Sequence, residues 1–402
     1  DPASGMILMA GVYYGAIFGG STSSILVNAP GVAGTVATSF DGYPMAMQGK
    51  AGKALAIAAV ASFAGGTIAA VLLMVAAPAL AQVSLSFQSP DYLMLMILGL
   101  TAVSAFASRG AVLQALIATV IGLMLSTVGT DPSAGIQRFT FGSLDLVDGI
   151  SFLLLAMATF ALSEALMSVL RRSGDAQDSL REAGEQIGSL KIEREEIREM
   201  VPTVGRSSVA GFFIGVLPGA GATIASFLAY GMERALAPMK EKLKFGHGSI
   251  RGLAAPETAN NAACTGSFVP LLTLGIPGSG TTAVMLGALI SYGVQPGPTL
   301  FQDNPAIFWS VIISMYIGNV ILLILNLPLI PYIAKLLALP RQLLVPLILF
   351  FSLIGVYLVS FNTFDIFMMT AFAVVAIFLR LFGYPMAPLL LGCLLGGMME
   401  AH

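Results

Sequence analysis

The chain has 402 residues, of which 56% are hydrophobic and only 10% are charged. A soluble domain usually carries about a quarter charged residues, so a soluble domain of this size is excluded. The formal net charge of −2 offers no basic surface to a nucleic acid. Glycine and proline are plentiful but follow no collagen period. The composition is typical of an α-helical membrane protein with several spans.

Enzymatic chemistry has little support in the sequence. The two cysteines lie in apolar stretches and the two histidines are far apart, so we expect neither a disulfide framework nor a metal site built on them. No Walker A sequence and no cofactor motif occurs. No single residue stands out as a catalytic acid or nucleophile. We therefore expect a protein that is not an enzyme and that needs no cofactor.

The first predicted element is a broken apolar segment at 11–35, which contains glycine, hydroxyl residues and Asn28-Ala-Pro30-Gly31. Proline and glycine interrupt a helix and leave backbone N–H and C=O groups without partners. In a bilayer such groups need protein, water or a ligand. Free helix N-termini favour anions, whereas free carbonyl and side-chain oxygens suit Na⁺. The segment is thus a candidate binding element.

Residues within and after this segment carry further signals. Tyr13 and Tyr14 either stack on a carboxylate or aromatic substrate or simply pack, and the sequence leaves both alternatives open. The sequence Asp-Gly-Tyr-Pro that begins at Asp41 predicts a turn.

A membrane span needs about 20 apolar residues. The predicted spans are 54–81, 92–107, 111–128, 150–170, 306–334, 343–361, 366–382 and, incompletely, 387–399.

Basic residues are concentrated in two stretches. Twelve of the 19 lysines and arginines lie in 171–206 and 234–251, so we place both on the cytoplasmic side. In the first stretch Ile187, Leu190, Ile197 and Val201 recur at helical spacing, and Lys191 and Glu195 form an i,i+4 pair. The pattern predicts an amphipathic cytoplasmic helix; a solvated tether between two halves is the alternative.

The segment between the basic stretches, 207–235, is apolar and is broken at Pro218-Gly219-Ala220-Gly221. Because both flanks are placed in the cytoplasm, we expect the segment to enter the membrane and return as a re-entrant hairpin. One kinked span is the alternative, and it would put one basic flank outside.

A second broken apolar segment lies at 256–282. It contains Asn260 and Asn261 and ends in Ile-Pro-Gly-Ser-Gly-Thr-Thr, and Glu257 follows a proline at an expected helix start. Compensation of the helix dipole is the expected role of Glu257, and a proton-carrying role is the alternative. Glycine in spans also serves close helix packing. Three Pro-Gly breaks beside hydroxyl and amide residues nevertheless favour a binding site.

The two broken segments are related by a shift of 247 residues. Gly19, Pro30, Gly31 and Thr35 then fall on Gly266, Pro277, Gly278 and Thr282. Basic loops correspond to loops without basic residues, for example Lys50 and Lys53 to Gly297 and Leu300, as expected for an inverted repeat. The predicted organisation is a first repeat at 1–170, a linker at 171–206 and a second repeat at 207–402. The same shift predicts a further Pro-Gly hairpin ahead of residue 1 and an incomplete last span.

Helix ends, hydroxyls and amides are therefore the predicted ligands. The residues assigned to an anionic substrate are Ser21, Thr22, Ser23, Pro30, Gly31, Pro218, Gly219, Gly221, Thr223, Pro277, Gly278, Ser279, Thr281 and Thr282. The residues assigned to a cation, Na⁺ at these positions, are Asn28, Asn260, Asn261, Gly219 and Gly278.

These motifs resemble those of the large membrane subunit of tripartite tricarboxylate transporters, the TctA family. The resemblance is carried by motifs at 11–22, 28–31, 41–44, 215–222, 245–248, 255–262 and 274–279. It implies a multi-pass protein of the bacterial inner membrane with re-entrant hairpins and an elevator mechanism. It further implies a small four-span membrane subunit and a periplasmic solute-binding protein as partners. The resemblance also implies import of di- or tricarboxylates by Na⁺ or H⁺ symport. A passive channel or scaffold subunit is the alternative function.

Overall fold

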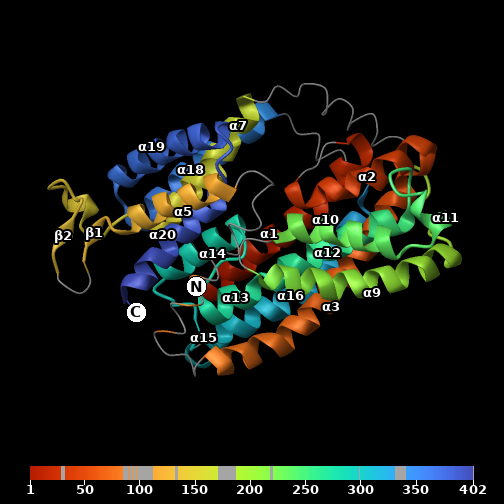
Figure 1. The fold of residues 1–402 in the computed structure, drawn as a ribbon, viewed down its shortest axis with the longest axis horizontal. Helices are drawn as coiled ribbons and strands as arrows, with labels where there is room; N and C mark the ends of the chain where they lie inside the picture. The colour runs from red at the N-terminus through yellow and green to blue at the C-terminus, as the bar shows by residue number, and fades with distance from the viewer. Residues whose placement is uncertain are drawn as a thin grey trace.

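In the computed structural model, the described part of the chain is almost entirely helical (Figure 1). The structure describes residues 1–28, 32–84, 90, 94, 97, 112–131, 135–170, 187–217, 221–297, 299–330 and 341–401. The α-helices are α1 (Pro2–Val27), α2 (Val36–Met45), α3 (Ala51–Ser84), α5 (Val112–Ser126), α6 (Phe152–Ala156), α7 (Ser163–Leu170), α9 (Arg194–Val216), α10 (Gly221–Leu236), α11 (Met239–Lys242), α12 (Ile250–Gly266), α13 (Phe268–Leu274), α14 (Gly280–Ser291), α15 (Leu300–Asp303), α16 (Pro305–Asn326), α18 (Arg341–Ser360), α19 (Thr363–Leu381) and α20 (Met386–Ala401).

Short elements join or continue these helices. The 3₁₀ and π segments are η1 (Ala33–Thr35), η2 (Ala46–Lys50), η3 (Leu144–Leu146) and η4 (Met157–Leu162). The strands β1 (Gly129–Thr130) and β2 (Gln137–Arg138) pair antiparallel, with Gly129 opposite Arg138.

Four described helical stretches are long and apolar enough to cross a membrane: Pro2–Leu26, Ala33–Leu80, Pro305–Asn326 and Thr363–Leu381. Large apolar side chains lie on their outer faces; Leu8 on α1 is 69% exposed and Phe378 on α19 is 58% exposed. Such faces are unfavourable in water and favourable in lipid. The prediction of an all-α membrane protein is confirmed.

Helices also occupy the predicted spans that fall in the described residues. α3, α5, α16, α18, α19 and α20 each cover most of one such segment, and α6, η4 and α7 together cover 150–170. The predicted span at 92–107 lies almost wholly outside the described residues.

The prediction of a turn at Asp41 is wrong. Asp41 lies inside α2 and is fully buried. Its Oδ1 atom accepts hydrogen bonds from the backbone N–H groups of Gly246, Gly248 and Ser249 at 2.7–2.9 Å. Asp41 therefore ties α2 to the loop that precedes α12, a long-range role that a local turn signal does not reveal.

The prediction of a helix in the linker is correct only from Arg194 onward. Residues 187–193 are not helical, so Lys191 precedes α9 and cannot pair with Glu195 along it. The Ile187 carbonyl instead accepts a hydrogen bond of 2.6 Å from the N–H of Gly52, and its side chain is buried against the start of α3. Residues 171–186 lie outside the described part.

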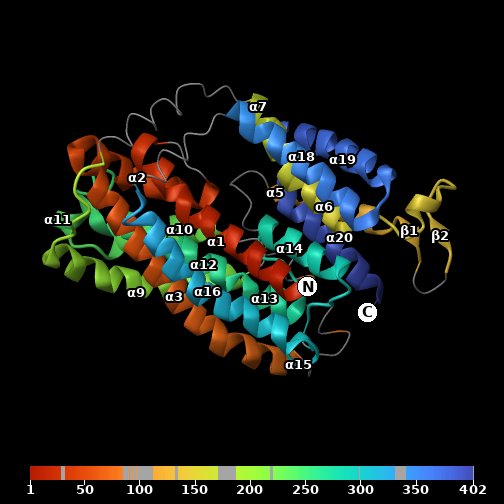
Figure 2. The ribbon, with the colours of Figure 1, turned by 180° about the vertical axis from the view of Figure 1, so that it is seen from behind.

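The helices gather in two groups, which both views show (Figures 1 and 2). One group contains α5, α6, α7, α18, α19 and α20 and has its own buried apolar clusters. The other contains α1, α2, α3, α9, α10, α12, α13 and α16 around the larger clusters. α14 lies between them and contacts α6 on one side and α1 on the other.

α12 forms the centre of the larger group. All its residues from Gly252 to Gly266 are buried, and α3, α9 and α10 pack around it. Glycines on the neighbours allow this approach, as small residues do between membrane helices. A Cβ atom on Gly211 of α9 would lie 2.6 Å from the Ala259 carbonyl oxygen. The contact between α9 and α12 is thus a contact between backbones.

This packing predicts different costs for two alanine substitutions on α9. Gly211→Ala should lower the free energy of unfolding by about 1–3 kcal/mol because the new methyl group has no space. Gly205→Ala should be neutral or stabilising by up to about 1 kcal/mol, because a Cβ at Gly205 meets nothing within 4 Å. Thermal unfolding of the purified variants in detergent measures both. Equal effects would contradict the close contact.

Candidate functional site

Three breaks interrupt the helices of the larger group and its link to α14. At the first, Asn28 ends α1 in the left-handed conformation with φ of 54°. The second separates α9 from α10. The third separates α13 from α14, and Gly275 ends α13 with φ of 69°. The predicted site residues that lie outside the described part are Pro30, Gly31, Pro218 and Gly219.

The structure brings these breaks together beside α12. A Cβ atom on Gly34, in the first break, would lie 3.2 Å from the Cβ of Ala222 at the start of α10 and 3.7 Å from that of Asn260. A Cβ atom on Gly221 would lie 3.9 Å from the carbonyl oxygen of Gly278 in the third break. Three segments that are far apart in the sequence thus lie close together in the fold.

α9 and α10 fold back on each other around the second break. Thr203 on α9 donates a 2.9 Å hydrogen bond to Glu233 on α10, and both residues lie 15 positions from Pro218. Arg206 contacts the same carboxylate at 2.7 Å, as does Arg251 from α12. The two helices are therefore an antiparallel pair; their re-entrant position in the bilayer stays a prediction.

The N-terminus of α14 is capped by its own hydroxyl groups. Ser279 and Thr282 form a capping box, in which the N–H of Ser279 donates to Thr282 Oγ1 at 2.8 Å. The hydroxyl of Tyr13 lies 3.1 Å from Ser279 Oγ. Tyr13 is also buried beside Phe268, with ring centroids 6.2 Å apart. Packing is thus the role in which the structure finds Tyr13.

Tyr14 is held in the same way. It is buried, its hydroxyl is hydrogen-bonded to Thr265, and its ring stacks on Phe268. Both tyrosines therefore connect α1 to the helices around the third break.

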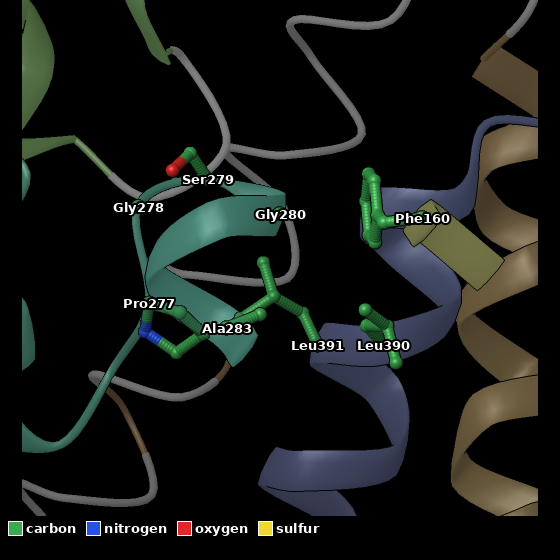
Figure 3. Close-up of a pocket in the computed structure, with 8 residues that line it drawn as sticks. All are labelled: Phe160, Pro277, Gly278, Ser279, Gly280, Ala283, Leu390 and Leu391. Atoms are coloured by element: carbon green, nitrogen blue, oxygen red, sulfur yellow. The ribbon is translucent and has the colours of Figure 1, made fainter. Parts of the chain in front are cut away.

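A small cavity of about 10 Å³ opens at the third break, which is room for about one water molecule. Pro277, Gly278 and Ser279 form one wall. Figure 3 shows Phe160 and Leu390 facing them from η4 and α20. The third break therefore lies at the seam between the two helix groups.

The remaining predicted substrate residues differ in accessibility. Thr281 is exposed in the first turn of α14, and Gly221 and Thr223 are partly buried at the start of α10. Thr22 is buried, and Ser23 donates to the Gly20 carbonyl oxygen at 3.3 Å. The N-termini of α10 and α14 are thus brought together, whereas Thr22 is buried and Ser23 is hydrogen-bonded within α1.

The asparagines predicted to bind a cation do not all meet. Asn260 donates a 3.2 Å hydrogen bond to the carbonyl oxygen of Gly34, and Asn261 donates to Asn260 Oδ1 at 2.8 Å. Asn261 Oδ1 is buried and has no hydrogen-bond partner among the described residues. Asn28 is exposed at the end of α1, and no described contact joins it to this pair.

The prediction that Glu257 lies at a helix start is wrong. α12 begins at Ile250 with Ser249 as its N-cap, so Glu257 lies in the middle of the helix. It is fully buried, and its carboxylate accepts hydrogen bonds from Ser21 at 2.6 Å, from Ser62 at 2.9 Å and from Thr38. An acidic residue within an apolar segment indicates a functional site. Pro256, which precedes Glu257, instead suggested a helix start.

Comparison with known proteins identifies the family. The family model described as the tripartite tricarboxylate transporter TctA family matches residues 1–391. The chain belongs to this family. It is 44% identical over 403 residues to an uncharacterized 52.8 kDa protein in the TAR-I ttuC' 3' region of Agrobacterium vitis, covering all of this chain and 78% of the relative. No solved structure matches the chain.

A second relative, an uncharacterized protein in the TAR-II ttuC' 3' region of Agrobacterium vitis, is 46% identical over 192 residues. This match covers 48% of the chain and 78% of the relative. TctA proteins are multi-pass membrane subunits of tripartite tricarboxylate transporters. They work with a small membrane subunit and a periplasmic binding protein.

In this TctA protein we expect the buried Glu233 to be a structural anchor. Glu233→Ala should lower the free energy of unfolding by about 3–5 kcal/mol, because Arg251 and Arg206 lose their shared partner. Glu241→Ala is the matched control. Glu241 holds Lys244 at 2.8 Å near the surface, which raises the pKa of Lys244, and its loss should cost about 1 kcal/mol or less. Thermal unfolding in detergent compares the two; equal losses would contradict the anchor role.

Proposed function

We propose that this chain is the large membrane subunit of a binding-protein-dependent secondary transporter in a bacterial inner membrane. It imports di- or tricarboxylates or related organic acid anions by symport with Na⁺, H⁺ being the alternative coupling ion. Its partners are a small four-span membrane subunit and a periplasmic solute-binding protein. Family membership supports the transport role.

The meeting of the three breaks at α12 carries the proposal. The N-termini of α10 and α14 point partial positive charge into the same region, and Gly221 and Gly278 come close there. A carboxylate is the ligand that two such helix ends favour. Discontinuous helices of this kind bind substrate and coupling ion in many secondary transporters.

The proposed orientation is supported by contacts among basic and polar segments. Lys53 at the start of α3 lies 2.8 Å from Glu196 of α9, and Gln48 donates to the His247 carbonyl oxygen at 2.8 Å. Segments assigned to the cytoplasm from their charges thus meet at one end of the helices. The β1–β2 hairpin lies at the opposite end, which the proposed orientation places in the periplasm (Figure 1).

The proposed inverted repeat is supported by exchanged helix contacts. The shift of 247 residues relates α1 to α12 and α13, α2 to α14, and α3 to α16. α1 packs on α16, whereas α12 and α13 pack on α3. An internal two-fold axis requires this exchange of partners.

The proposed elevator mechanism needs one body that moves past another. All three breaks border the larger group, and the third one meets the smaller group at Phe160 and Leu390. Movement along this seam would carry the breaks from one side of the membrane to the other. A fixed channel or scaffold, the alternative function, needs no such seam.

Reconstitution of the three proposed components tests the function. Proteoliposomes should accumulate a carboxylate above the outside concentration only under an inward ion gradient, and an ionophore should abolish accumulation. A passive channel would equilibrate the substrate without a gradient. Asn260→Ala combined with Asn261→Ala should remove coupled uptake. Unchanged uptake by this variant would contradict the assignment of the asparagines to the ion.

The anion site predicts a charge-specific effect at Thr281. Thr281→Asp should reduce uptake by at least about tenfold, because a carboxylate at this helix end repels the anionic substrate. The fold should persist, since an acidic residue in the first turn of α14 interacts favourably with the helix dipole. Thr281→Asn has similar size without the charge and should retain most of the uptake. A similar loss in both variants would exclude electrostatic repulsion as the cause.

A further inference from the structure

Four helices meet at the carboxylate of Glu257. Ser21 comes from α1, Thr38 from α2 and Ser62 from α3, while Glu257 itself lies on α12. All four residues are buried, with at most 4% of any of them exposed. Each hydroxyl donates directly to a carboxylate oxygen. We call these four residues the cage. The cage joins the first broken segment to α12, the central helix of the second one.

When ionised, the Glu257 carboxylate has no positive partner in the described part of the chain. Among the described residues, no lysine, arginine or histidine forms a salt bridge with Glu257, whereas the buried Glu233 has two arginines. Three hydroxyls reduce the cost of burying a carboxylate but leave its charge in place. An uncompensated buried charge is strongly unfavourable. The site is thus suited to one monovalent cation.

The available ligands favour Na⁺ over a proton. Two carboxylate oxygens and three hydroxyl oxygens converge at the cage, and hard cations prefer such oxygen ligands. Asn261 Oδ1, one helical turn further along α12, is buried without a partner. A proton would be held by a single carboxylate oxygen, whereas Na⁺ can be coordinated by both carboxylate oxygens and by the hydroxyl oxygens together.

We propose that Glu257, with the hydroxyls of Ser21, Thr38 and Ser62, binds one Na⁺ ion, and that this ion is the coupling ion. The coupling role rests on the proposed transport function; the binding site does not. Ser21 and Thr38 lie on opposite sides of the first break. A bound ion holds the two sides of the break together against α12. Through Asn260 and Gly34, this order extends to the start of α10.

Sodium-dependent thermal unfolding of the purified full chain tests the site. The melting temperature is measured against NaCl concentration, with choline chloride keeping the ionic strength constant. The wild type should show a saturable rise of Tm with Na⁺, because a ligand that binds only the folded state stabilises it. Glu257→Gln should lose this rise. Its Tm in choline chloride should equal or exceed that of the wild type, because the unpaired charge is gone. Glu241→Gln, on α11 and away from the cage, should keep the full response.

A hydroxyl pair on α2 supplies a second comparison. Thr38→Val removes one ligand of the cage and should raise the half-saturating Na⁺ concentration by about tenfold. Ser39→Ala is the matched control, because Ser39 donates to the Val36 carbonyl oxygen within its own helix. It should leave the Na⁺ response unchanged.

Three outcomes would overturn the site. An equal Na⁺ response in the wild type and in Glu257→Gln would place the ion elsewhere. A wild type that responds to acidification but not to Na⁺ would assign a proton to Glu257 and refute Na⁺ binding. Equal effects of Thr38→Val and Ser39→Ala on the Na⁺ response would show that the Thr38 hydroxyl does not bind the ion.

Uptake measured in parallel separates this proposal from the transport function. If Glu257→Gln still accumulates carboxylate under a Na⁺ gradient, the coupling role fails and the transport function stands. If the wild type binds Na⁺ at Glu257 but accumulates no carboxylate, the transport function fails and the site stands.

Discussion

α12 places polar side chains through the centre of an apolar protein, and none of them reaches solvent. Glu257, Asn260, Asn261 and Thr265 are all fully buried. In such surroundings each polar group needs a partner from the protein itself. The partners come from helices on every side, for example Tyr14 for Thr265 and the Gly34 carbonyl for Asn260. The close approach of α3 follows from this requirement, since Ser62 of α3 must come within hydrogen-bonding distance of Glu257.

Two buried glutamates illustrate opposite solutions to the same electrostatic cost. Glu233 lies between Arg206 and Arg251 and also accepts from Thr203, so its charge is fully paired. It fixes α9, α10 and α12 at one end of the bundle. Glu257 lies deeper and is surrounded by neutral donors only. The first arrangement is suited to permanent structure, and the second to an ion that arrives and leaves.

Local chemistry made most of the helices and all three breaks predictable from the sequence. Apolar length indicated the spans, and Pro-Gly pairs indicated where helices stop. The role of Asp41 was not predictable, because its three backbone partners lie more than 200 positions away. The same holds for Glu257, whose hydroxyl partners are supplied by three other helices. Residues 187–193 have helical spacing, but the segment is not helical and its apolar side chains join the cluster at the start of α3.

Charge balance links the proposed ion site to the proposed anion site. Each helix N-terminus carries about half an elementary positive charge, so the ends of α10 and α14 together offset about one negative charge. A carboxylate bound there would still face the charge of Glu257 across Asn260 while the cage lacks an ion. With Na⁺ in the cage that repulsion disappears, so the loaded body no longer carries the charge of Glu257 in addition to the charge of the substrate. Substrate without ion, or ion without substrate, leaves one site unbalanced in a low-dielectric interior. The loaded body would therefore cross with both ligands together, which is the condition for symport.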